Sequence, residues 1–142
     1  GRDGGATMAG IHDEIEAVIK DLLASEHDAL QGLGQHLKTA LVDHIKTTAH
    51  LLNELTADRF EALGGSFDYL MQTGYLFGGW QLGRSALVAQ ELLKSGEKTD
   101  FCERKMATAG FYGERILPRC TACAGTILAA GDTLSKYSLE WL

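Results

Sequence analysis

The sequence predicts an all-α fold, an antiparallel up-down-up-down four-helix bundle with a Pro-kinked last helix. Three observations support this prediction. Apolar residues recur at helical spacing along most of the 142 residues, the chain contains one proline, and no Asn-Gly or Asp-Gly turn is flanked by alternating apolar residues. Because proline interrupts helices, its scarcity favours long uninterrupted ones. With 45% hydrophobic and 23% charged residues, a chain of this length can bury a core as one domain.

Three parts are expected along the chain. Residues 1–7, rich in glycine and without a period, are expected to form a flexible linker, residues 8–134 the bundle domain, and residues 135–142 a C-terminal tail. The first helix of the bundle is predicted at Met8–Ser25. The residues that share its apolar face are Ile11, Ile15, Val18 and Leu22.

The second helix, predicted at Leu30–Leu55, has two rows of residues at seven-residue spacing, as in the seam of a helical bundle. One row is Leu30, Leu37, His44 and Leu51, and the other is Gly34, Leu41, Thr48 and Leu55. We expect His44, at the seam, to be a hydrogen-bonded core histidine. A short helical turn is predicted at Arg59–Leu63, with Ser66 as the N-cap of the next helix.

The third helix, predicted at Phe67–Lys94 and ended by Gly96, has two apolar faces. One comprises Phe67, Leu70, Met71, Gly74, Phe77, Gln81, Val88 and Leu92, and the other comprises Tyr69, Leu76, Trp80, Gly83 and Leu87. A helix that is apolar on two faces is central in its bundle or contacts something beyond it. Glycines four residues apart on this helix let another backbone approach closely. The residues expected at packing or interface contacts are Tyr75, Gly79, Trp80, Gly83 and Arg84.

The fourth helix is predicted at Phe101–Leu134, with Asp100 and Glu103 as its start signal. Pro118 falls inside this pattern, so we expect a kink near Glu114–Leu117.

Cys120 and Cys123 form a C-x-x-C motif on this helix. A redox pair needs a helix N-terminus, where the dipole lowers a thiol pKa, and the predicted position of this pair is mid-helix. A zinc site needs four ligands, and a second ligand pair is missing from the sequence. Packing of buried thiols is therefore the favoured interpretation, with redox or metal chemistry as the alternative.

No other motif predicts catalysis or metal binding. All five histidines precede residue 51, Glu-x-x-His is absent, and His50 with Glu54 gives a single pair one turn apart. No phosphate-binding glycine loop and no G-x-S-x-G occurs. We expect Arg84, Arg115 and Arg119 to be solvated or ion-paired, or alternatively to meet carboxylates of a neighbouring domain.

The distribution of charge and hydropathy limits the classes of molecule that the chain can bind. The net charge is −6 and no Lys/Arg patch is present, which argues against nucleic acid. The most apolar stretch, Tyr69–Ala89, is interrupted by Gln72, Gln81 and Arg84, so no membrane span is predicted. Since the sequence does not start with the features of a signal peptide, we expect a cytoplasmic protein with reduced thiols.

Four segments of the last two predicted helices are distinctive: YLM at 69–71, GGWQLGRSAL at 78–87, KMATAGFYGE at 105–114 and ILP at 116–118. They resemble the C-terminal helical extension of bacterial acyl-CoA dehydrogenases of the 3-methylmercaptopropionyl-CoA dehydrogenase-like subgroup. The resemblance implies a parent flavoprotein that introduces a 2,3-double bond into an acyl-CoA, in which a glutamate removes the α-proton and FAD accepts the β-hydride.

In that family the glutamate belongs to a Glu-Gly-Thr-(Asn/Thr) segment upstream of the linker, and this segment does not occur in the chain. The resemblance therefore implies no catalytic, cofactor-binding or metal residue here. We expect a non-catalytic domain that braces the flavin core or its oligomer. The alternative is an autonomous, self-associating bundle that uses Gly79, Trp80 and Gly83. The expected partner is accordingly the catalytic core of the parent dehydrogenase or a second copy of the chain.

Overall fold

The computed structural model describes residues 3–57 and 59–134. Within these ranges it contains six helices and no strand, so the all-α prediction is confirmed. The helices are α1 (Ala6–Leu23), α2 (Asp28–Ala57), α3 (Arg59–Gly64), α4 (Ser66–Lys94), α5 (Thr99–Arg115) and α6 (Arg119–Leu134). The predicted tail at 135–142 lies outside the described residues.

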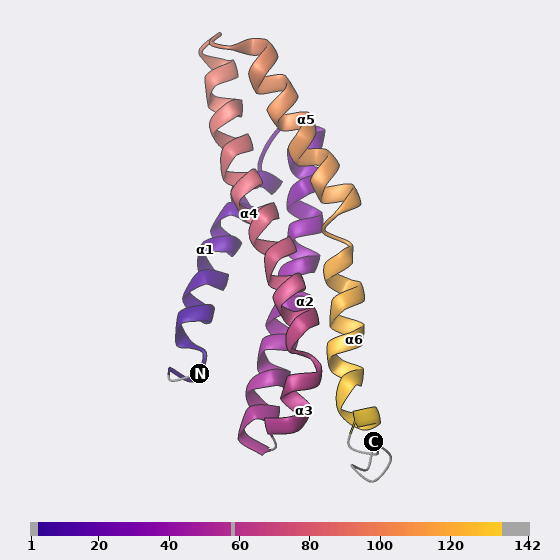
Figure 1. The fold of residues 1–142 in the computed structure, drawn as a ribbon. Helices are drawn as coiled ribbons and strands as arrows, with labels where there is room; N and C mark the ends of the chain where they lie inside the picture. The colour runs from indigo at the N-terminus through magenta and orange to yellow at the C-terminus, as the bar shows by residue number, and fades with distance from the viewer. Residues whose placement is uncertain (1–2, 58, 135–142) are drawn as a thin grey trace.

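The long helices pack side by side around α2 and α4 (Figure 1). α1 and α4 run in one direction, whereas α2, α5 and α6 run in the other. α2 contacts α1, α4, α5 and α6, and α4 contacts the same outer helices. The core therefore forms where these two central helices meet their neighbours.

The buried side chains follow the predicted seam over the first part of α2, as far as His44, whereas Leu55 at the end of the second predicted row is 46% exposed. From α2, Leu30, Leu33, Leu37 and His44 are completely buried. The hydrophobic residues that pack around them from the other helices are Ile15, Ile19 and Leu22 of α1, Leu76 and Ala86 of α4, and Cys102, Met106 and Ala109 of α5. Burial of a Leu or Ile side chain contributes about 1.5–3 kcal/mol, so this shared core holds the helices together.

The predicted fourth helix requires a correction. Instead of one kinked helix over Phe101–Leu134, the structure has α5 and α6 separated by residues 116–118. Pro118 has no N–H and its ring clashes with the carbonyl four residues earlier, which ends α5. The ladder changes register there: the Leu117 N–H donates to the Tyr112 carbonyl (3.2 Å), and the Cys120 N–H donates to the Leu117 carbonyl (2.9 Å). A complete break thus replaces the predicted kink.

The helix ends confirm one predicted signal and correct two. Gly96 follows α4 with φ 76°, its N–H donates to the Leu93 carbonyl, and the Glu97 N–H donates to the Leu92 carbonyl, which is a Schellman C-cap. The α4 N-cap is Gly65 rather than Ser66, whose hydroxyl donates to the Leu63 carbonyl.

The Asp100 start signal is also wrong, because the N-cap of α5 is Lys98 and makes no side-chain cap bond. At the other end of the chain, α1 begins two residues earlier than predicted. The Asp3 carboxylate accepts hydrogen bonds from the backbone N–H groups of Gly5 (3.1 Å) and Thr7 (2.9 Å), which satisfies free donors at the start of the helix. Hydrogen bonds from Thr7 and Gly5 lower the pKa of Asp3 to about 2.

The glycines of α4 differ in their surroundings. A Cβ at Gly79 would lie 2.8 Å from a Leu117 methyl and 3.1 Å from a Leu37 methyl. A Cβ at Gly83 would lie 3.1 Å from Leu22 and 3.2 Å from Val18. Gly74 has nothing within 4 Å of the same position. Gly79 and Gly83 therefore let α4 approach its neighbours, and Gly74 does not.

We predict that Gly79→Val lowers the free energy of unfolding by about 1–3 kcal/mol, because the added methyls overpack the contact with Leu117 and Leu37. Gly74→Val is the matched control on the same helix and should change stability by no more than about 0.5 kcal/mol. Urea unfolding followed by circular dichroism measures both. Equal effects of the two substitutions would contradict a packing role for Gly79.

Candidate functional site

A buried layer of polar side chains crosses the molecule and is centred on His44. The His44 ring has no exposed surface, lies edge-on to His12 of α1 (centroids 5.1 Å apart) and stacks on Tyr69 of α4 (4.9 Å). The distance between His12 Nε2 and His44 Nδ1 is 2.8 Å, and that between His44 Nε2 and Thr73 Oγ1 is also 2.8 Å. One side chain of α2 thus connects α1 to α4.

The hydrogen bonds fix the direction of each proton in this layer. The Thr73 hydroxyl donates to the Tyr69 carbonyl (2.8 Å), so its oxygen accepts the proton on His44 Nε2. His44 Nδ1 is then the acceptor, and His12 Nε2 is the donor. The Thr48 hydroxyl donates to the His44 carbonyl (2.7 Å), so it accepts from the Tyr69 hydroxyl (2.8 Å). Every hydrogen in this half of the layer has a partner.

The other half of the layer is built on Gln72, which is also completely buried. Its Oε1 accepts from the Thr47 hydroxyl (2.6 Å), and its Nε2 donates to the Cys120 carbonyl (3.1 Å). The Cys120 thiol donates back to the Gln72 carbonyl (3.7 Å). Gln72 thereby connects α2 to α6 through α4.

Sequence reasoning identified His44 and missed its companions. Gln72 entered the sequence analysis as an interruption of an apolar stretch, although it lies four residues before Leu76, which is also completely buried. Residues four apart on a helix share a face, so the register of Leu76 would have predicted a buried amide.

The polar layer has a structural role, because its side chains are neutral and already hydrogen-bonded. Burial, with a smaller contribution from His12, lowers the pKa of His44 to about 4, so the ring is neutral at pH 7. Burial also lowers the pKa of His12. A neutral ring whose two nitrogens are both hydrogen-bonded has no free lone pair for proton transfer or metal binding. Within residues 3–57 and 59–134, no group of three or more His, Cys, Asp or Glu is placed to hold a metal ion.

The C-x-x-C motif lies elsewhere on its helix than predicted. Because α6 begins at Arg119, Cys120 is in the first helical turn rather than mid-helix. That position favours a thiolate, but burial raises the pKa of Cys120 to about 12 and also raises the pKa of Cys123. The burial effect is the larger one, and it favours packing over redox chemistry.

The five predicted contact residues divide into interior and surface. Gly79 and Gly83 are buried against other helices of the same chain. Tyr75 and Trp80 are half-buried, and Arg84 is exposed. The Arg119 guanidinium lies 5.8 Å from the centre of the Tyr75 ring, and the Arg84 guanidinium lies 6.0 Å from that of Trp80. The glycines are therefore not available as a surface for self-association.

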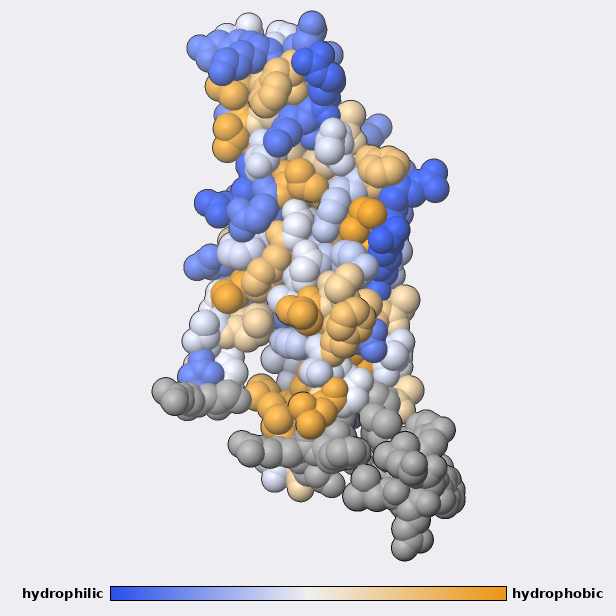
Figure 2. Space-filling view, viewed as in Figure 1, coloured by the Kyte–Doolittle hydropathy of each residue, from blue (hydrophilic) through white to orange (hydrophobic). Residues whose placement is uncertain are grey.

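One apolar face of α4 is exposed. We use the term outer face of α4 for four exposed apolar residues of this helix: Phe67 (69% exposed), Leu70 (67%), Met71 (37%) and Val88 (60%). These residues belong to the first of the two apolar faces that the sequence predicted. Figure 2 shows hydrophobic side chains on the surface along the side of the molecule that carries α4. Phe67, Leu70 and Met71 lie close together on this face, and a cluster of exposed large apolar side chains is typical of an interaction surface. Val88 lies about 25 Å further along the helix, and Phe77 and Leu92 of the same predicted face pack against the core.

Comparison with known proteins finds a matching family and two relatives that are much longer than this chain. The family described as acetyl-CoA dehydrogenase C-terminal like matches residues 11–137. The chain is 37% identical over 138 residues to the 3-methylmercaptopropionyl-CoA dehydrogenase of Ruegeria pomeroyi, a match that covers 97% of this chain and 23% of the relative. It is 30% identical over 148 residues to the broad-specificity linear acyl-CoA dehydrogenase FadE5 of Mycobacterium tuberculosis, covering 98% of this chain and 23% of that relative. The chain thus spans about a quarter of the length of each.

The lowered pKa of His44 predicts a pH-dependent stability. Below pH 6.5 the unfolded chain binds a proton at this histidine, whereas the folded chain does so only near pH 4. The free energy of unfolding should therefore fall by up to about 1.4 kcal/mol per pH unit as the pH decreases through this window. Urea unfolding between pH 7 and pH 4.5 measures the slope.

His44→Gln should reduce this slope, because it removes one of the two histidines whose pKa burial lowers, and His12 accounts for the slope that remains. The control is His27→Gln, which changes an exposed histidine on the α1–α2 connection and should keep the original slope. An unchanged slope in His44→Gln would show that another group is responsible.

Proposed function

The chain belongs to the acetyl-CoA dehydrogenase C-terminal-like family, and from this membership we propose that it is a non-catalytic helical domain of an acyl-CoA dehydrogenase. The observation that supports this most directly is the family match over residues 11–137 together with the 23% share of each relative. The parent enzyme would use FAD to oxidise an acyl-CoA at its 2,3-bond. The proposed compartment is the cytoplasm, where thiols such as the three of this chain stay reduced.

The described residues do not fit FAD. The most apolar hollow, of about 320 Å³, lies between α1, α2, α3 and α4, and four of the eleven described residues that line it are leucines. Among the described residues of its wall, Asp3 alone is charged, and the hydroxyls of Thr48 and Tyr69 on that wall already bond each other. A dinucleotide carries two phosphates, which need basic side chains or free backbone N–H groups. We therefore place the cofactor outside this domain.

The domain would act as a brace through the outer face of α4. We propose that α5 and α6 together form one interrupted rod, so that the chain makes an antiparallel up-down-up-down four-helix unit. The polar layer fixes the register of that unit, which gives the outer face a rigid support. The partner would be the catalytic core, because the relatives are about four times as long as this chain, and the family resemblance implies that the catalytic glutamate lies upstream of the matched segment.

None of the helices in residues 3–57 and 59–134 combines the length and hydropathy that crossing a bilayer requires. Covering one of the large side chains of the outer face completely would contribute about 1.5–3 kcal/mol to docking.

We predict that the purified chain folds as a helical protein, shows no flavin absorbance and does not oxidise acyl-CoA substrates with an artificial electron acceptor. Circular dichroism, visible spectroscopy and a turnover assay measure these three properties, with the Ruegeria pomeroyi dehydrogenase as the positive control. Stoichiometric flavin together with turnover in this chain would refute a non-catalytic role.

A chimera tests the docking face. In it, this chain replaces the matching C-terminal segment of the Ruegeria pomeroyi dehydrogenase. Leu70→Ser should destabilise the chimera by about 1.5–3 kcal/mol, because a docked leucine is lost, and should leave the isolated chain within about 0.5 kcal/mol. Thermal unfolding of both proteins measures the difference.

Phe111→Ser is the matched control, since Phe111 is 61% exposed but lies on α5. It should affect neither protein. If Leu70→Ser destabilises the chimera no more than it destabilises the isolated chain, the outer face of α4 does not dock.

A further inference from the structure

A positive charge interrupts the outer face of α4. Arg84 is exposed, and it comes seven residues after Phe77 and fourteen after Leu70, so that these three side chains lie in one row along the helix. Val88, the last residue of the outer face, follows about 6 Å further along the axis. Arg84 therefore lies between the apolar residues at the start of the face and the one at its end.

The neighbours of the Arg84 guanidinium are neutral. Its Nη1 donates to Gln81 Oε1 (3.3 Å), and its central carbon lies 6.0 Å from the centre of the Trp80 ring. In the part of the chain that the structure describes, the ion pair is that of Lys94 with Glu91, and it does not include Arg84. Gln81 and Trp80 thus position the guanidinium without neutralising it.

The carboxylates of the helices around Arg84 are directed elsewhere. Glu91, the next acid along α4, already has its ion pair. Asp68, the preceding acid, lies near α6, because burial and, after it, the charge of Asp68 raise the pKa of Cys123. On α1, Asp21 is exposed and forms no ion pair among residues 3–57 and 59–134. The described residues therefore leave the charge of Arg84 uncompensated.

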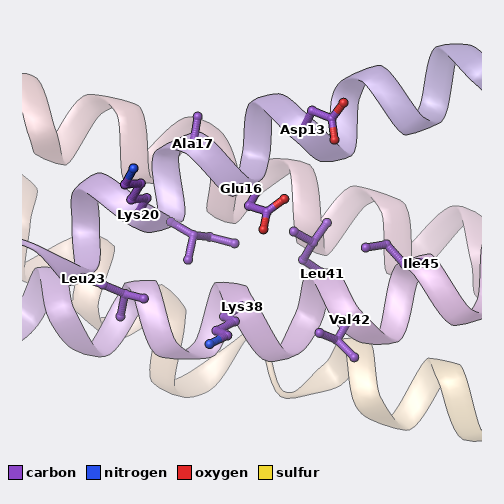
Figure 3. A pocket seen from close by; sticks show the side chains of 10 residues that line it. Asp13, Glu16, Ala17, Lys20, Leu23, Lys38, Leu41, Val42 and Ile45 are labelled. Atoms are coloured by element: carbon purple, nitrogen blue, oxygen red, sulfur yellow. The ribbon is translucent and has the colours of Figure 1, made fainter.

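The groove between α1 and α2 differs in this respect. It has a volume of about 470 Å³, and both signs of charge line it: Asp13 and Glu16 with Lys20 and Lys38 (Figure 3). Because two carboxylates and two ammonium groups share that surface, it has no net sign and does not select the charge of a partner. The outer face of α4 has a single sign and does select it.

Docking through the outer face would remove Arg84 from water together with the apolar side chains on either side of it. A guanidinium that loses its water without gaining an anion strongly destabilises a complex. A carboxylate can replace the lost water, because its two oxygens accept two parallel N–H bonds from arginine. The chemistry that fits this face is therefore apolar area with a carboxylate beside it.

We propose that the partner surface covering the outer face of α4 carries an aspartate or glutamate that pairs with Arg84. This inference rests on the proposed function, in which the partner is the catalytic core of the dehydrogenase. The carboxylate lies about 20 Å along α4 from the contacts of Leu70. The apolar residues supply the area that is covered, and the single charge near one end discriminates between the two directions in which the core could lie along α4.

Cross-linking tests the pairing in the chimera with the Ruegeria pomeroyi dehydrogenase. Arg84→Lys keeps the positive charge and introduces an amine, which a water-soluble carbodiimide joins to a carboxylate in contact with it. Mass spectrometry of the digested protein should find position 84 linked to an aspartate or glutamate of the dehydrogenase part. Arg104→Lys, at an exposed position on α5, is the matched control and should give no link to that part.

Charge reversal gives a second measurement. Arg84→Glu should lower the midpoint of thermal unfolding of the chimera by about 3 °C or more, because two carboxylates then face each other in the docked state. The midpoint of the isolated chain should stay nearly unchanged, since position 84 is exposed there. Arg104→Glu is the control for reversal and should change neither midpoint.

A chimera in which position 84 gives no link to the dehydrogenase part, or links only to acids of this chain, would overturn the pairing. An Arg84→Glu chimera as stable as the unsubstituted one would overturn it equally. If Leu70→Ser still destabilises the chimera in either case, the outer face docks through its apolar residues alone and the proposed function stands. If Leu70→Ser has no effect, docking itself is wrong and the pairing with it.

Discussion

Both ring nitrogens of a buried histidine need hydrogen-bond partners, and the partners of His44 determine how α1, α2 and α4 are aligned. Leaving either nitrogen unpaired inside the protein would cost about 1–3 kcal/mol. The ring meets this requirement with His12 on one side and Thr73 on the other, and these residues lie on α1 and α4. A shift of α2 by one turn would break both bonds. Apolar side chains tolerate such sliding far better, so the polar layer specifies the alignment while the leucines supply the burial.

The glycines of α4 act together with this layer. Hydrogen bonds between side chains as short as serine or threonine need closely spaced helices, and Gly79 and Gly83 provide that spacing where Leu117 and Leu22 press against α4. Each glycine in a helix costs about 1 kcal/mol relative to alanine. At Gly79 and Gly83 the packing of leucine methyls into the space beside the glycine offsets that cost. Gly74 on the same helix faces open space and has no such contact.

Much of this could be predicted from the sequence, and the failures have local physical causes. The seven-residue rows predicted the α2 seam and the burial of His44, because periodicity reports which face is buried. Pro118 predicted where the last helix is interrupted but not that it breaks completely, since a break depends on which backbone carbonyls find new donors. Gln72 was missed because its partners, Thr47 and Cys120, are 25 and 48 residues away in the chain, and sequence spacing does not reveal such pairs.

Several titratable side chains are buried and several large apolar ones are exposed in this chain, which is the reverse of their distribution in an enzyme active site. An active site exposes titratable groups to a cavity and buries the apolar residues that support them. Here the histidines at the centre are neutral and hydrogen-bonded, and the Cys120 thiol is held protonated by burial. The large apolar side chains of the outer face of α4 remain at the surface. A protein built in this way has its reactive groups committed to its own architecture, so what it offers to other molecules is shape, apolar area and exposed charge. The proposed docking role uses these properties, and it agrees with the match of this chain to a family described as acetyl-CoA dehydrogenase C-terminal like.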